Sequence, residues 1–143
     1  MSKNNMNDIN TEGLTFLEDG EVLYNDLYLL SETDEKGIVL YANYSFLKIA
    51  NMKEEDILGQ PHNIVRHPEM PRAAFKSLWD DVKEKGFWTG YVKNSRKGGG
   101  HYWVYATVLR SVDKNGNTKY VSIRVKPSRE EIKKAQELYL TLD

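Results

Sequence analysis

The sequence contains no cysteine, and this absence excludes a whole group of functional sites. Disulfides, thiolate metal sites, iron–sulfur clusters, cysteine nucleophiles and photoadducts formed on cysteine all need a thiol. A chain that uses no disulfide fits a reducing compartment, so we expect a cytoplasmic protein.

Long apolar segments are also lacking. The longest apolar-leaning run, Tyr102 to Leu109, is interrupted by Thr107 and is far shorter than the ~20 residues that a membrane-spanning helix needs. Residues 1–11 lack the apolar stretch of a secretory signal. We therefore expect no direct insertion into a membrane.

Neither sign of charge prevails. The chain has 20 Lys+Arg and 21 Asp+Glu, a formal net charge of −1, and no long basic run. Proteins that bind nucleic acid by neutralising its phosphates usually carry a clear cationic excess. The composition therefore argues against a nucleic-acid partner.

Sequence motifs of enzymes and metal sites are missing too. There is no G-x-S-x-G, H-E-x-x-H or G-x-x-x-x-G-K-[ST] pattern. The spacing of His62, His67 and His101 matches no known metal site. Gly98–Gly100 precedes a predicted strand and not a helix, so it indicates a hairpin turn rather than a phosphate-binding loop. We expect neither an enzyme nor a metal protein.

The length of 143 residues, 40% of them apolar, is sufficient for one core. We divide the chain into a flexible arm (1–11), an N-terminal cap (12–27), a central domain (28–127) and a C-terminal helix (128–143). The spacing of apolar residues in the cap indicates neither a helix nor a strand.

Five strands are predicted in the central domain. Residues 28–33 and 38–42 form a hairpin, and three strands that are rich in aromatic and β-branched residues cover 87–94, 102–112 and 118–125. Between these two groups, short helices are expected over 43–50, with Asn43 as N-cap, and over 53–59. A longer helix begins at Pro71 and ends before Gly86, and prolines make 60–70 an irregular loop. The predicted fold is α+β, a five-stranded antiparallel sheet with helices on one face and a ligand space between them.

The C-terminal helix starts at a capping box made by Ser128 and Glu131 and has one apolar stripe. Two features next to the predicted ligand space suggest binding. The loop of residues 59–71 carries Arg66, His67 and Glu69 between prolines, and Trp79 and Trp88 are among several flat side chains nearby. The alternatives are a solvated loop and aromatic side chains that only fill the core.

The order and spacing of these residues also resemble those of a known protein family. The run from Gln60 to Phe75, followed by Leu78-Trp79, the segment 86–90, Val92–Asn94 and His101–Val104, resembles the PAS domain of bacterial aerotaxis receptors. The resemblance extends over about residues 28–142. Because the chain ends shortly after one such domain, it also resembles the stand-alone PAS proteins of bipartite energy-taxis systems.

The resemblance implies a PAS fold that holds FAD non-covalently between the sheet and the helices. Arg66 and His67 match the family's FAD-binding pair, Trp88 matches an aromatic residue beside the flavin, and Asn43 and Asn94 match positions near its ring system. Glu69 stands where the family usually has aspartate.

The function implied is that of a redox or oxygen sensor that signals in trans to a membrane-bound chemotaxis transducer. A homodimer through the N-terminal cap, the sheet face or the C-terminal helix is a further expectation. Two alternatives stay open, namely a heme-binding gas sensor and a cofactor-free interaction or dimerisation module.

Overall fold

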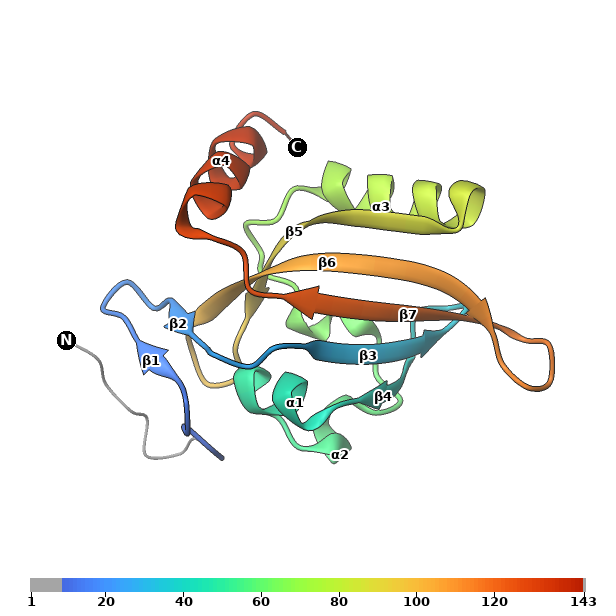
Figure 1. The fold of residues 1–143 in the computed structure, drawn as a ribbon, viewed down its shortest axis with the longest axis horizontal. Helices are drawn as coiled ribbons and strands as arrows, with labels where there is room; N and C mark the ends of the chain where they lie inside the picture. Colours follow the sequence, from blue (N-terminus) through green and yellow to red (C-terminus); the bar gives the residue numbers. More distant parts are fainter. Residues whose placement is uncertain (1–8, 143) are drawn as a thin grey trace.

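The structure, a computed structural model, describes residues 9–142 and contains the predicted five-stranded antiparallel sheet (Figure 1). The order of the strands across the sheet is β4-β3-β7-β6-β5. Their bounds are β3 (Leu29–Asp34), β4 (Val39–Ala42), β5 (Phe87–Ser95), β6 (His101–Val112) and β7 (Thr118–Val125). The α+β fold predicted from the sequence is confirmed.

Alternation along the strands gives the sheet an inner and an outer face. On β6, Tyr102, Val104, Ala106 and Val108 are all buried and point inward. Because successive side chains of a strand point to opposite faces, Tyr105 and Thr107 lie on the outer face. The main core therefore lies on one side of the sheet.

Four helical segments cover the inner face: α1 (Tyr44–Ala50), α2 (Glu54–Ile57), the 3₁₀ helix η1 (His62–Val65) and α3 (Arg72–Lys85). Asn43 caps α1 as predicted, and Gly86 ends α3 with a left-handed backbone at φ 88°. Two details of the prediction were wrong. Residues 62–65 form η1 inside the loop expected to be irregular, and Pro71 is the N-cap of α3 and not its first residue.

The N-terminal cap contains a small hairpin of β1 (Thr15–Phe16) and β2 (Val22–Leu23). It is attached to the sheet where β6 begins, because the His101 N–H donates to the Gly20 carbonyl at 2.9 Å. Residues 1–8 of the predicted flexible arm lie outside the described residues. At the end of that arm, the Ile9 N–H donates to the Asn51 side-chain oxygen at 2.9 Å.

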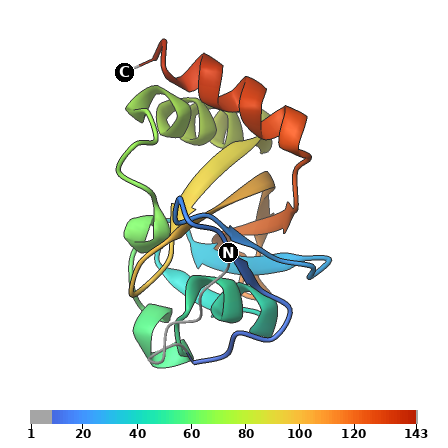
Figure 2. The ribbon, with the colours of Figure 1, turned by 90° about the vertical axis from the view of Figure 1, so that its left-hand side faces the viewer.

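Helix α4 (Arg129–Tyr139) begins at the predicted capping box of Ser128 and Glu131. Its apolar stripe packs against Trp103, which is on the outer face of β6. Figures 1 and 2 show α4 at the side of the sheet where β5 lies. Within residues 9–142, every helix is too short or too polar to cross a membrane.

Candidate functional site

A cavity of about 280 Å³ lies between the inner face of the sheet and the segment from η1 to α3. Its volume is close to the lower end of the range for small-molecule sites, about 300–1,000 Å³. One wall consists of apolar side chains of β5, β6 and α3: Val92, Ala106, Val108, Phe75, Leu78 and Trp79. The other wall is polar, because Thr33 of β3 and Ser122 and Arg124 of β7 face the cavity.

Arg124 is the most unusual residue of the polar wall. It is only 4% exposed, and its guanidinium lies 5.1 Å from the centre of the Phe46 ring. Its Nη1 donates to the Leu29 carbonyl at 3.4 Å. No carboxylate within residues 9–142 lies at ion-pair distance from it. Burial lowers the pKa of Arg124 to about 10, so the buried guanidinium keeps its charge at neutral pH.

His62 is the hydrogen-bond partner of Arg124 in the cavity wall. Its Nε2 lies 2.8 Å from Arg124 Nη2 and 3.1 Å from the hydroxyl of Ser31. Because guanidinium can only donate, Nε2 is the acceptor and the imidazole is neutral. Burial, together with the neighbouring Arg124 charge, lowers the pKa of His62 to about 3.

Three of the residues predicted from the sequence line this cavity: Arg66, Trp79 and Asn94. The Arg66 guanidinium lies 4.7 Å from the centre of the Phe75 ring. The Trp79 ring meets the Tyr120 ring edge to face at 5.3 Å. Asn94 is buried in β5 and forms a backbone bridge with Arg66. The loop and the sheet edge thus meet at the cavity.

His67 and Glu69 do not line the cavity. The His67 N–H donates to the Lys93 carbonyl at 3.2 Å, and its Nδ1 accepts the Glu69 N–H at 3.0 Å. The exposed Glu69 carboxylate binds Lys93 Nζ at 2.6 Å, and the hydrogen bond from Lys93 lowers the pKa of Glu69. The His67 ring lies 5.9 Å from that of His101. These side chains hold the loop against the edge strand β5.

Trp88 is buried between the sheet and α3 and also lies outside the cavity lining. Its Nε1 donates to the Ser77 hydroxyl at 3.3 Å. Its ring covers Gly90, where a Cβ would come within 2.4 Å of it. A glycine at this position is what allows the indole to lie against the strand.

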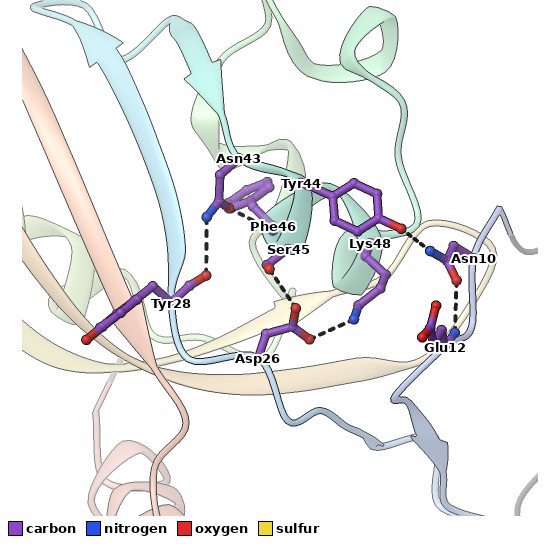
Figure 3. A network of polar contacts seen from close by, with 9 residues as sticks. All are labelled: Asn10, Glu12, Asp26, Tyr28, Asn43, Tyr44, Ser45, Phe46 and Lys48. Carbon is purple, nitrogen blue, oxygen red and sulfur yellow. Dashed lines mark hydrogen bonds and ion pairs between the residues drawn. The ribbon is translucent and has the colours of Figure 1, made fainter.

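Asn43 is the N-cap of α1 and also bonds to the backbone around the start of β3 (Figure 3). Its side-chain oxygen accepts the N–H groups of Phe46 at 2.9 Å and Leu30 at 3.1 Å, and its Nδ2 donates to the Tyr28 carbonyl at 3.3 Å. Asn43 therefore ties α1 to β3 without reaching the cavity lining.

A second polar group in Figure 3 ties the N-terminal segment to α1. The Asp26 carboxylate accepts a hydrogen bond from Ser45 at 2.6 Å and pairs with Lys48 at 2.8 Å. Burial acts to raise the pKa of Asp26, but the bonds from Lys48 and Ser45 outweigh it and lower the pKa. The segment before β3 thus holds the helix that Asn43 caps.

Sequence reasoning missed Arg124, His62, Thr33 and Ser122 as site residues. A signal for two of them is present in the segment 118–125, where Ser122 and Arg124 occupy positions that alternate with Val121 and Ile123. Polar residues on the inward positions of a strand indicate either a polar core or a ligand.

Comparison with known proteins agrees with this architecture. The family model described as "PAS fold" matches residues 39–124, which is more than half of the chain. The chain is 40% identical over 121 residues to the aerotaxis receptor of Escherichia coli (strain K12), covering 85% of this chain and 24% of the receptor. It is 23% identical over 91 residues to the nitrogen fixation regulatory protein of Klebsiella oxytoca, covering 64% of this chain and 18% of that protein.

The fold of this chain also matches a solved structure described as "Flavin Analogue Sheds Light on Light-Oxygen-Voltage Domain Mechanism". Its TM-score is 0.65 at 19% identity, and the match covers 82% of this chain and 88% of that one. The match shows a shared fold. With its five-stranded antiparallel sheet, its helices on the inner face and a family match across both, this chain belongs to the PAS-fold family.

Proposed function

We propose that the chain is a cytoplasmic, non-enzymatic redox sensor that binds FAD non-covalently in the cavity between sheet and helices. The observation that carries this proposal is Arg124, a buried cation that faces the cavity and has no anionic partner among the described residues. A cofactor that takes up an electron gains negative charge, and a buried cation stabilises that charge strongly because little water screens it.

The residues present fit the flavin part of FAD. Phe75, Leu78 and Trp79 supply apolar and aromatic surface for a flat ring system, and the polar wall supplies groups that can meet its carbonyl oxygens and ring nitrogens. A cavity of about 280 Å³ encloses one ring system and not a whole dinucleotide. The rest of FAD would extend beyond the cavity, where Arg66 is exposed on the loop. A bound flavin would supply reversible electron uptake.

The predicted site residues take different roles in this proposal. Arg66, Trp79 and Asn94 would contact the cofactor. His67 and Glu69, which lie outside the lining, would contact only the part of FAD that extends from the cavity. Trp88 and Asn43 would support the site through α3 and α1.

The relatives' names favour the same function. One relative is an aerotaxis receptor, another is a nitrogen fixation regulatory protein, and the light-oxygen-voltage domain that shares the fold was studied with a flavin analogue. We extend the proposal to a role in energy taxis, with a membrane-bound chemotaxis transducer as partner in trans. The N-terminal cap, the outer sheet face and α4 are the surfaces through which this chain would meet that transducer or a second copy.

The residues favour flavin over the two alternatives. Among the described residues His62 is the one histidine that lines the cavity, and its Nε2 accepts a hydrogen bond from Arg124, so it is poorly suited to bind the iron of heme. A cofactor-free module would gain nothing from a buried cation in its wall, because an apolar residue would cost less there.

The absorbance spectrum of the purified protein tests the proposal. Two bands in the near-ultraviolet and blue that bleach during anaerobic reduction are the expected result. Arg124→Met should lower the affinity for FAD at least tenfold, whereas the matched substitution of the exposed Arg72 to Met should not. A Soret band, or colourless protein after expression with ample flavin, would contradict the proposal.

A further inference from the structure

Three hydroxyl-bearing residues lie on the inner face of β3 and β7, and the hydroxyl of Thr33 is buried without a partner. Ser31 bonds to His62 at 3.1 Å, which satisfies its hydroxyl. Thr33, two residues further along the same face, is 5% exposed, and its Oγ1 has no hydrogen-bond partner within residues 9–142. Ser122 lies on the adjacent strand, is 8% exposed and lines the same cavity.

The buried and unpartnered hydroxyl of Thr33 makes the folded state less stable. A buried polar group without a hydrogen bond loses its hydration and gains nothing in return. Valine has nearly the shape of threonine and would occupy position 33 without this cost. A partner from outside the described chain would therefore explain the hydroxyl, and both Thr33 and Ser122 line the cavity.

We infer that Thr33, with Ser122 beside it, is a ligand-binding residue that selects a ring system with hydrogen-bond acceptors. This inference rests on the proposed function, in which the ligand is a flavin. The carbonyl oxygens and ring nitrogens of a flavin accept hydrogen bonds, and rotation about the Cα–Cβ bond of Thr33 can turn its hydroxyl toward the cavity.

Thr33 and Ser122 belong to β3 and β7, and not to the 59–71 loop that carries Arg66, His67 and Glu69. Thr33 and Ser122 lie diagonally across the β3–β7 pair, in which Ser31 pairs with Ser122 and Thr33 with Tyr120. Together with Arg124 they make one continuous polar surface. A ring system buried in the cavity would contact this surface whether or not phosphates extend outside the cavity. The contact should therefore depend on the ring system and not on the phosphates.

The test compares Thr33→Val with Thr33→Ser, which keeps the hydroxyl, and with Thr107→Val, the same change on the outer face of β6. Dissociation constants are measured by flavin fluorescence for lumiflavin, riboflavin, FMN and FAD with protein freed of cofactor, and the melting temperature of that protein is recorded. Thr33→Val should weaken all four ligands about tenfold. It should leave the melting temperature equal or higher, because an unpaired hydroxyl has been removed.

Thr33→Ser and Thr107→Val should bind within about threefold of the original protein. Ser122→Ala should weaken all four ligands in the same direction as Thr33→Val. If Thr33→Val binds every flavin as tightly as the original protein, water satisfies the hydroxyl and the inference is wrong. If it lowers the melting temperature along with the affinity, its role is structural and the inference is again wrong. If the original protein binds none of the four ligands, the proposed function itself fails.

Discussion

Arg124 and His62 share a hydrogen bond that fixes the protonation of both residues. The guanidinium keeps its proton although burial lowers its pKa to about 10, and the imidazole stays neutral because its pKa falls to about 3. The polar wall of the cavity therefore keeps the buried positive charge of Arg124 over the whole physiological pH range. This charge is stable against pH changes, which suits the proposed site for an electron-accepting cofactor.

His62 makes stability depend on pH. Between pH 6.5 and 3 the unfolded chain binds a proton at this residue that the folded chain does not bind, so the free energy of unfolding falls as the pH decreases. The slope from one such group is at most about 1.4 kcal/mol per pH unit. Urea unfolding of cofactor-free protein at pH 7, 6 and 5 should show this decline, and His62→Gln should reduce it.

His67 and His101 also make the free energy of unfolding fall as the pH decreases, because burial lowers the pKa of both. Part of this fall should therefore remain in His62→Gln. His67→Gln is the matched control and should change the slope less, because the His67 side chain is partly exposed. Equal slopes in His62→Gln and the original protein would show that the fold does not lower the pKa of His62.

The limits of sequence reasoning at the residue scale have a physical cause. Arg66 can be predicted because prolines on its loop are conspicuous, and Asn94 because it matches a family position. Arg124 cannot, because it lies inside a segment whose β-branched and aromatic residues predict a strand equally well whichever way the arginine points. Only the pairing of strands shows that it points inward.

Helix α4 is attached to the sheet by few contacts. Its buried residues Ile132 and Ala135 pack on Trp103, and the Tyr139 ring stacks on that indole at 6.4 Å. A second attachment joins its first residue to the N-terminal cap, since Arg129 binds the buried Glu21 carboxylate through two bonds of 2.5 and 2.8 Å. The N-terminal cap and the C-terminal helix thus meet at this ion pair.

Arg129→Gln should loosen α4 and the β1–β2 hairpin together. The substitution leaves the buried Glu21 carboxylate without its cation, and because Arg129 itself is largely exposed we expect a cost of about 1–2 kcal/mol, below that of a fully buried pair. Hydrogen exchange should become faster in residues 129–139 and near 15–23. Glu130→Gln, on the exposed side of α4, is the control. Faster exchange in α4 alone would mean that the ion pair does not join the two elements.

At the scale of elements, local signals predict structure well and long-range contacts escape prediction. The capping box of Ser128 and Glu131 and the strands of the hairpins need only neighbouring residues for their prediction. The β1–β2 hairpin has strands of two residues each, too short for a pattern, and exists because it packs against the start of β6. Its structure depends on the rest of the fold.

The sheet connects the cavity with the outer surface across a single layer. On β5, Asn94 faces the cavity, while its neighbour Lys93 lies on the outer face and pairs with Trp103, the residue on which α4 packs. The hydroxyl of Tyr139 in α4 also donates to the Tyr91 carbonyl of the same strand. A shift of β5 at Asn94 would therefore change the support of α4 directly.

Asn94→Ala tests this connection in the whole molecule, given the proposed flavin. Reduction of a flavin usually adds a proton to a ring nitrogen, so an acceptor becomes a donor, and the Asn94 amide can answer by rotating because it has both functions. In the original protein, hydrogen exchange in residues 129–139 should differ between the oxidised and the reduced state. In Asn94→Ala, which should still bind the cofactor through the other walls, that difference should disappear. Thr89→Ala, on the outer face of the same strand, should keep it. An undiminished difference in Asn94→Ala would show that the signal leaves the cavity by another route, with the polar wall of β3 and β7 as the next place to examine.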